Sequence, residues 1–348
     1  MYDSCTHTPE IGLEVQCSLS AMERPTSSPN ETGTAVPTTR LAPSPTGALH
    51  LGNARTFLVN WALARQNGWK VVLRIEDLDT PRVKPGVIEQ TIETLGWLGM
   101  DWDEVAPLQS SDLAPYRSAM DALARAGCVF PSELSRTEIA EAAGAPHEDS
   151  GEVRFDASLR PSEFPCAFAD AQTNWRLAVP AGRVDFTDSF LGPQSIDVSA
   201  SVGDFVVWTQ RGQPSYQLAV TVDDHRQGVT HVVRGDDLVD SAARQTLIRR
   251  ALGIGRDPVY CHLPLVRGAD GKRLAKRHGD TRIDHYREKG VPAERVIALI
   301  ARWCGLPGRN ELVLASDFAS GLSLDTMSRE DVTFTPEDDR WLLDAASR

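Results

Sequence analysis

The stretch LAPSPTGALHLGNARTF, residues 41–57, sets prolines and glycines between an expected strand and an expected helix. Residues 38–43 are typical of a short strand, and from His50 onward apolar residues recur at close to helical spacing as far as Gly68. Where a strand turns into a helix N-terminus, backbone N–H groups lack intrahelical partners and the helix dipole adds a partial positive charge. The stretch therefore predicts a strand–turn–helix unit whose turn favours a phosphate group.

Four residues of this turn strengthen the expectation of a phosphate site. Gly47 and Gly52 carry no side chain that would keep a ligand from the backbone, and His50 and Asn53 each add a hydrogen-bond donor. An ordinary tight strand–helix turn has the same features, and short Gly/Pro patterns more often belong to such turns. Taken alone, the stretch leaves both interpretations open.

The order of the other expected elements predicts the fold class. The segments with strand or helix patterning are strands at 70–77, 229–235 and 259–266, and helices at 87–99, 112–126, 241–253 and 292–306. Strands that alternate with helices form a parallel sheet with crossover helices. We therefore expect an α/β, Rossmann-like fold with helices on both faces of the sheet.

Changes in amino-acid composition and in hydrophobic periodicity divide the chain into five expected segments. These are a disordered leader at 1–37, a first half of the Rossmann-like domain at 38–127, an inserted irregular α+β subdomain at 128–210, a second half at 211–280, and a helical C-terminal segment at 281–348. The leader is assigned from its Ser, Thr, Pro and Glu content and its lack of periodicity.

Composition limits the class of protein. The chain of 348 residues is 41% hydrophobic and 24% charged, and it has no apolar run of the roughly 18 residues that a membrane span requires. Its six cysteines form no CxxC pair, which favours a reducing cytoplasm. The net charge of −12 argues against binding nucleic acid through overall charge, although residues 226–295 hold 15 Lys/Arg against 9 Asp/Glu, a local excess of +6.

A second basic element lies after the last expected strand. The segment GADGKRLAKRHGD, residues 268–280, carries five basic side chains, Lys272, Arg273, Lys276, Arg277 and His278. Phosphoryl and nucleotidyl transfer need cations at the polyphosphate, and a loop flanked by glycines can supply them. An isolated basic run is more often a solvated turn.

Together, the two elements resemble the signatures of the class I aminoacyl-tRNA synthetases. HLGN stands in place of the HIGH signature and RLAKR in place of KMSKS. The blocks RLAPSPTGALHLGNART, LRIEDLDTPR, SYQLAVTVDD, GVTHVVRGDDL and KRLAKRHGD are similar to the glutamyl subgroup and span residues 40–280 in order. Five ordered blocks are a far more specific signal than any one of them.

The resemblance implies a glutamate pocket. Its residues would be Arg40, Leu41, Ala42, Pro43, Ser44, Glu76, Tyr216 and Arg234. Glutamate carries two carboxylates and one ammonium group, so a pocket for it should offer two cationic donors and one anion, here Glu76. Considered singly, Arg40, Glu76 and Arg234 are equally typical of structural ion pairs.

The resemblance also implies an ATP site and a reaction. The ATP site would comprise His50, Gly52, Asn53, Arg273 and Lys276, with Mg²⁺ accompanying the ATP. The glutamate α-carboxylate would attack the α-phosphorus, giving glutamyl-adenylate and pyrophosphate. His50, Asn53 and Lys276 are the expected catalytic residues, which would act by positioning and electrostatic stabilisation, so loss of Lys276 should lower the rate more than the glutamate affinity.

The acceptor is suggested by the short C-terminal part of the chain and by one pocket position. By this resemblance, residues 38–127 and 211–280 would form the catalytic domain. Only 72 residues lie beyond Lys276, so no anticodon-binding domain is expected, and Val220 stands where full-length enzymes usually have Asn. The chain thus resembles the truncated glutamyl-queuosine tRNA(Asp) synthetase family, which implies transfer of glutamate to the queuosine base in the anticodon of tRNA(Asp). The alternatives are a minimal glutamyl-tRNA synthetase that charges the 3′ end, a catalytically retired RNA-binding paralogue, and a small-molecule nucleotidyltransferase.

The remaining expectations concern zinc, RNA contacts and assembly. Ser132 and Leu134 stand where many members of the truncated family have zinc-binding cysteines, and Cys128 and Cys166 alone cannot form a tetrahedral site, so no zinc is expected. His147 is expected on a surface loop. A monomer is expected. The candidate tRNA contacts are Arg249, Arg250, Arg273, Arg277 and Arg282.

Overall fold

The structure of the chain, a computed structural model, describes residues 36–135, 137–139, 153–272, 274, 280–306 and 312–344. The expected leader at 1–37 lies outside these residues except for its last two positions. The described residues belong to one compact unit, and the boundaries proposed within it stay predictions.

Three parallel strands form the first half of the central sheet. They are β1 (Thr38–Leu41), β2 (Lys70–Leu73) and β3 (Glu104–Val105). Helix α1 (Leu51–Asn67) connects β1 to β2, and α2 (Val87–Trp97) precedes β3. All side chains of β1 are buried, as expected for a parallel strand that is covered on both faces.

A second group of parallel strands occurs later in the chain. Strand β10 (His231–Gly235) pairs with β11 (Val259–Leu263) through the crossover helix α7 (Val239–Ala251). Strand β6 (Val184–Asp188) pairs in parallel with the other edge of β11, and β7 (Gly192–Ile196) returns antiparallel to β6. The predicted α/β class with a parallel sheet and crossover helices is confirmed.

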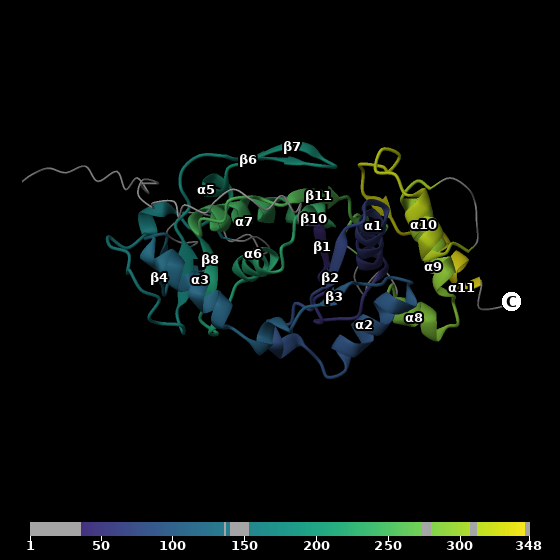
Figure 1. The fold of residues 1–348 in the computed structure, drawn as a ribbon, viewed down its shortest axis with the longest axis horizontal. Helices are drawn as coiled ribbons and strands as arrows, with labels where there is room; N and C mark the ends of the chain where they lie inside the picture. The colour runs from purple at the N-terminus through teal and green to yellow at the C-terminus, as the bar shows by residue number, and fades with distance from the viewer. Residues whose placement is uncertain are drawn as a thin grey trace, which may run out of the picture. The chain divides into compact units, whose positions relative to one another are not determined.

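The two halves meet at β1 and β10, which lie side by side in Figure 1. The Thr230 N–H donates to the Thr38 carbonyl at 2.9 Å, and the Thr38 N–H donates to Thr230 Oγ1 at 2.8 Å. On one side of this contact β1 pairs with β2, and on the other side β10 pairs with β11. Such a switch point opens a crevice at the carboxyl ends of the strands, which is where α/β proteins bind ligands.

The segment expected to be an insertion contributes to two sheets. An antiparallel sheet contains β4 (Val129–Ser132), β5 (Asn174–Leu177), β8 (Phe205–Thr209) and β9 (Gln213–Pro214). Its flanking helices are α3 (Ala114–Arg125), the short α5 (Val198–Ser201) and α6 (Tyr216–Arg226). The β6–β7 hairpin comes from the same stretch of sequence but pairs with β11, so it extends the parallel sheet instead.

The C-terminal segment packs onto the central unit. It contains α8 (Ile283–Glu288), α9 (Ala293–Trp303), α10 (Ala315–Gly321) and α11 (Pro336–Leu343). Strand β13 (Val332–Thr333) pairs in parallel with β12 (Val266–Arg267), and α10 lies against α1 (Figure 1). The described residues also contain single 3₁₀ turns at Thr80–Arg82, Gln109–Ser111, Ala157–Leu159 and Asp236–Leu238. Within the described ranges, none of the helices is long and apolar enough to cross a membrane.

Candidate active site

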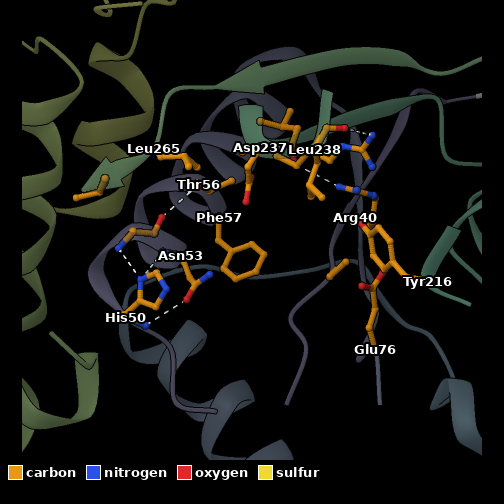
Figure 2. A pocket seen from close by; sticks show the side chains of 16 residues that line it. Arg40, His50, Asn53, Thr56, Phe57, Glu76, Tyr216, Asp237, Leu238 and Leu265 are labelled. Carbon is orange, nitrogen blue, oxygen red and sulfur yellow. Dashed lines mark hydrogen bonds between the residues drawn. The ribbon is translucent and has the colours of Figure 1, made fainter. Parts of the chain in front are cut away.

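A pocket opens at the carboxyl ends of β1 and β10, beside the N-terminus of α1. Figure 2 shows His50 and Asn53 at one end of it and Arg40, Glu76 and Tyr216 at the other. The remaining lining residues are Ala42, Gly52, Thr56, Phe57, Val233, Arg234, Gly235, Asp237, Leu238, Leu265 and Val266. The fold thus brings together residues that are more than 200 positions apart in the sequence.

His50 caps helix α1 with its imidazole. Its Nδ1 accepts hydrogen bonds from the N–H groups of Gly52 at 3.1 Å and Asn53 at 3.3 Å, and Asn53 Oδ1 accepts from the His50 N–H at 3.4 Å. Because Nδ1 is an acceptor here, the proton of the neutral ring is on Nε2. The cap therefore fixes the tautomer and makes Nε2 a hydrogen-bond donor at the helix N-terminus.

Gly52 leaves just enough room for this arrangement. A Cβ at position 52 would lie 3.0 Å from His50 Cε1 and 3.1 Å from His50 Nδ1. Gly52→Ala is expected to push the ring out of its capping position. With the role in amino-acid activation that the resemblance implies for His50, kcat for that step should fall about 10-fold or more, since a misplaced catalytic group is costly. Pyrophosphate exchange measures this. Gly96→Ala in α2 is the control, because a Cβ there meets no atom within 4 Å, and equal kcat losses in both variants would contradict the prediction.

Arg40 is a buried cation that lacks a full set of partners. Its side chain is 5% exposed, its Nη1 donates to the Val233 carbonyl at 3.3 Å, and its Nε lies 3.6 Å from Asp224 Oδ1 without a hydrogen bond to any described residue. Burial lowers the pKa of Arg40, and the neighbouring cations Arg74 and Arg234 add to this effect against the attraction of Asp224. A buried guanidinium in this state stabilises an incoming anion.

Glu76 is held by a buried ion-pair network. Arg74 donates to Glu76 Oε1 from Nη2 at 3.1 Å and from Nε at 3.3 Å, and its Nη1 donates to Asp224 Oδ1 at 2.7 Å. Burial raises the pKa of Glu76, and this effect exceeds the opposing effect of Arg74 and Arg40. In the described part of the chain, Glu76 Oε2 accepts no hydrogen bond. Glu76 is therefore a desolvated carboxylate that a cationic group would stabilise.

Three protein acceptors orient Arg234. Its Nε donates to His262 Nε2 at 3.0 Å, its Nη1 to Gln245 Oε1 at 3.0 Å and its Nη2 to the Leu238 carbonyl at 3.2 Å. A guanidinium has five N–H groups, so one N–H on each terminal nitrogen is left by these contacts. Two parallel N–H groups of this kind match a carboxylate.

The glutamate-binding residues predicted from the sequence lie in different places in the structure. Arg40, Ala42, Glu76, Tyr216 and Arg234 line the pocket. Ser44 lines an adjoining groove, which shares Glu76 and Tyr216 with the pocket. The side chain of Leu41 lies in the hydrophobic core.

The backbone of two predicted residues has a positioning role. The Leu41 carbonyl accepts from the Arg74 N–H at 2.9 Å, and the Pro43 carbonyl accepts from the Glu76 N–H at 3.0 Å. Leu41 and Pro43 therefore set the positions of Arg74 and Glu76 through main-chain pairing, and neither side chain lines the pocket.

The structure describes the second basic element at its flanks and at Leu274, which is buried in the hydrophobic core. Arg273, Lys276, Arg277 and His278 lie outside the described residues, and their placement stays a prediction. Before this loop, Leu265 and Val266 line the pocket. After it, the Leu51 N–H donates to the Thr281 carbonyl at 3.0 Å, and the Ile283 N–H donates to the Leu49 carbonyl at 2.8 Å. Both ends of the loop are therefore anchored at the pocket and at the His50 turn.

The structure corrects one of the expected RNA contacts. Arg249 is only 6% exposed, and its guanidinium donates to the Arg256 carbonyl, so it is not available at the surface. Helical spacing turns position 249 of α7 inward, while the neighbouring Arg250 is exposed. Arg282 is exposed and paired with Asp280.

The expected absence of zinc stays a prediction. Among the described residues, no group of three or more His, Cys, Asp or Glu side chains could hold a metal ion. Leu134 packs against the small hydrophobic cluster around Phe130, and the thiols of Cys128 and Cys166 are not in a disulfide. His147 lies outside the described residues.

Several residues around the pocket were missed by sequence reasoning. Arg74, Asp224 and His262 are the main ones, and all three are buried. Arg74 and Asp224 do lie in the quoted blocks LRIEDLDTPR and SYQLAVTVDD, which was the available signal. His262 had none, since a histidine in an apolar strand is usually a core residue.

Comparison with known proteins defines the class first. The family model for the catalytic domain of class I tRNA synthetases (E and Q) matches residues 37–337. A solved glutamate–tRNA synthetase from Elizabethkingia anophelis superposes with a TM-score of 0.74 at 26% identity, covering 88% of this chain and 70% of that one. The chain belongs to this family of class I tRNA synthetases and is a ligase of that kind.

Curated relatives then narrow the assignment. The glutamyl-Q tRNA(Asp) synthetase of Symbiobacterium thermophilum is 42% identical over 86% of this chain and 96% of its own length, and that of Geobacter sulfurreducens is 46% identical over 68% and 74%. The glutamate–tRNA ligase of Nitrosomonas europaea is 37% identical over 87% of this chain and 65% of its own length. Within the class, the chain belongs to the glutamyl-Q tRNA(Asp) synthetase family.

Proposed function

We propose that this protein activates L-glutamate with ATP and transfers it to the queuosine base in the anticodon of tRNA(Asp). The observation that carries the first half is the buried Arg40, a cation that lines the pocket and whose Nε donates no hydrogen bond to the described residues. A dicarboxylic amino acid supplies the anions that Arg40 and Arg234 would bind and the ammonium group that Glu76 would bind. Charge matching of this kind also disfavours amino acids with a neutral side chain.

The chemistry in this proposal relies on positioning and charge stabilisation. Arg40, Arg234 and Glu76 hold glutamate so that its α-carboxylate faces the α-phosphorus of ATP. The Nε2–H of His50 and the amide of Asn53 donate to phosphate oxygens at the N-terminus of α1, where the helix dipole also favours negative charge. Lys276 and Arg273 neutralise the charge that builds on the departing pyrophosphate. No protein side chain forms a covalent bond.

Mg²⁺ fits this site as a partner of ATP rather than as a bound metal of the protein. Magnesium sites of this kind use one or two carboxylates together with phosphate oxygens and water. Asp237 is the carboxylate that lines the pocket beside Gly235 and Leu238, so it is the residue that would share the ion with the phosphates. When bound, the ion would neutralise phosphate charge.

The adjoining groove is our candidate for the acceptor. It has a volume of about 980 Å³, against about 140 Å³ for the pocket, and it is lined by polar and cationic residues that include Arg82, Arg211 and Arg244. It shares Glu76 and Tyr216 with the pocket, so a nucleoside there would adjoin the activated glutamate. The 96% coverage of the Symbiobacterium glutamyl-Q relative supports this acceptor over the 3′ end of a tRNA. We expect a monomer that works in the cytoplasm.

Two assays test the proposal. Glutamate-dependent ATP–pyrophosphate exchange, run without RNA and with aspartate and glutamine as comparisons, should show activity with glutamate. Labelled glutamate, ATP and tRNA(Asp) with or without queuosine should then give label on the modified RNA alone. Charging of unmodified tRNA(Glu) would favour a minimal glutamyl-tRNA synthetase, and the absence of exchange would favour a retired paralogue.

Glu76→Gln tests the ammonium site. Removing the charge should raise the KM for glutamate about 30-fold or more, since a charge-assisted hydrogen bond contributes about 2 kcal/mol or more. Because burial raises the pKa of Glu76, glutamate affinity of the wild type should fall as the pH drops toward that pKa, where the protonated group cannot bind ammonium. The variant should lack this pH dependence. Exchange kinetics at several pH values measure both effects, and an unchanged KM in Glu76→Gln would rule out the assigned role.

A further inference from the structure

A buried histidine and a buried aspartate lie directly behind Arg234. His262 on β11 and Asp188 at the end of β6 are each fully buried, and neither side chain lines the pocket. His262 Nε2 accepts from Arg234 Nε at 3.0 Å, and His262 Nδ1 lies 2.6 Å from Asp188 Oδ2. The three side chains form a line that runs from the pocket wall into the sheet.

Asp188 determines which nitrogen of His262 carries the proton. Burial tends to raise the pKa of Asp188, but hydrogen bonds from His262 and from the Leu191 and Phe190 N–H groups outweigh burial and lower it. The carboxylate therefore stays ionised and only accepts. His262 Nδ1 must then be the donor, and Nε2 of the neutral ring must be the acceptor that faces Arg234.

We propose that Asp188 and His262 are positioning residues that set the orientation of the Arg234 guanidinium for binding a substrate carboxylate. This inference rests on the proposed function of Arg234 as a glutamate ligand. With Nε tied to His262, the rotation of the guanidinium is defined, and Gln245 and the Leu238 carbonyl hold its two terminal nitrogens. The remaining N–H groups then point in directions that do not depend on the substrate, which lowers the entropic cost of binding.

A further hydrogen-bond chain supports the same orientation. Gln245 Nε2 donates to Gln217 Oε1 at 3.2 Å, and Gln217 Nε2 donates to Ser241 Oγ at 2.9 Å. Each amide therefore has a defined orientation, in which the Gln245 oxygen accepts from Arg234 and the Gln217 oxygen accepts from Gln245. The two side chains that accept from Arg234, His262 and Gln245, are therefore oriented by Asp188 and Gln217. Of these two acceptors, only His262 needs a particular tautomer in order to accept.

Two substitutions at position 262 separate positioning from simple packing. His262→Gln keeps an acceptor within reach of Arg234 Nε, whereas His262→Leu fills similar space without one. We expect the KM for glutamate in pyrophosphate exchange to rise about 10-fold or more in His262→Leu, because it leaves a buried donor unpaired, and about 3-fold or less in His262→Gln. The kcat and the KM for ATP should change less than about 3-fold in both. A purely structural role would affect both variants, and all three parameters, alike.

Asp188→Asn provides an independent test with almost no change in shape. The amide introduced at 188 would donate to Nδ1 of His262, move the ring proton to Nε2 and set two donors against each other at Arg234. The KM for glutamate should rise about 10-fold or more, which is the rise expected for His262→Leu. This test remains valid if His262→Leu fails to fold. An unchanged KM for glutamate in Asp188→Asn would overturn the inference. An equal rise of this KM in His262→Gln and His262→Leu would also overturn it. Absence of glutamate-dependent exchange in the wild type would instead overturn the proposed function.

Discussion

Replacement of Arg74 by methionine is expected to lower the free energy of unfolding by about 3–5 kcal/mol. The Arg74 side chain is 0% exposed and is paired with Glu76 and Asp224, which are 13% and 5% exposed. Removing one partner of a buried ion pair leaves the other charges desolvated and uncompensated, and this is far more costly than losing a surface pair. Urea unfolding of the two proteins measures the difference.

A surface arginine serves as the matched control for this prediction. Arg340 in α11 is paired with Glu337, but the two side chains are 69% and 72% exposed. Arg340→Met should change the free energy of unfolding by about 0.5 kcal/mol or less, because water already screens that pair. If Arg74→Met lowered the free energy by no more than Arg340→Met does, the Arg74 network would not be a stabilising element.

Substitution of His50 should produce the largest catalytic loss among the described residues. His50→Asn and His50→Ala both remove the Nε2–H donor, and each is expected to lower kcat of glutamate activation about 100-fold, as for other preorganised donors to a developing negative charge. Single-turnover adenylate formation or pyrophosphate exchange measures this loss. Substrate KM values should change much less, because the donor acts mainly in the transition state.

The same pair of variants separates the two roles of His50. Asparagine is a good N-cap residue and alanine is a poor one, so His50→Ala should lower the free energy of unfolding by about 1 kcal/mol relative to His50→Asn. The imidazole now makes this cap through Nδ1, with bonds of 3.1 and 3.3 Å to the Gly52 and Asn53 N–H groups. Wild-type kcat in His50→Asn would show that His50 is only a cap and has no part in activation.

The central elements follow local rules and were predictable. Helix α1 begins after His50 and ends at Gly68, whose φ of 65° is accessible to glycine at low cost. The alternation of expected strands and helices predicted a parallel sheet, and the structure contains one. The pairing of β12 with β13 was not predictable, because each strand has only two residues and the two lie more than 60 positions apart.

The candidate site was also predictable only in part. The resemblance supplied Arg40, Glu76, Tyr216 and Arg234, and these residues do line one pocket. It also suggested Leu41 and Pro43 as glutamate-binding residues. Neither lines the pocket, and their carbonyls accept from the Arg74 and Glu76 N–H groups. Main-chain contacts of this kind depend on which strand lies alongside, and a motif does not record that.

Arg249 and Arg74 illustrate why charge patterns mislead. Arg74 lies in the strand expected at 70–77 and Arg249 in the helix expected at 241–253, and the excess of basic residues at 226–295 favoured Arg249 as a contact of the tRNA. In the structure, the Arg249 side chain donates a hydrogen bond to the Arg256 carbonyl. Arg74 forms ion pairs with the carboxylates of Glu76 and Asp224. The exposure of a charge depends on the partners that tertiary packing brings to it, not on its neighbours in the chain.

The sequence by itself determined the strand–turn–helix unit at 38–67, the α/β class and the residue types suited to a nucleotide and a dicarboxylic amino acid. These properties follow from short-range periodicity, helix capping and side-chain chemistry, which are encoded within a few tens of residues. Only the tertiary structure decided that Arg74 meets Asp224 across 150 positions and that His262 links Arg234 to Asp188. Buried polar groups must find partners wherever the folded chain supplies them, so these networks emerge from the packing of distant segments.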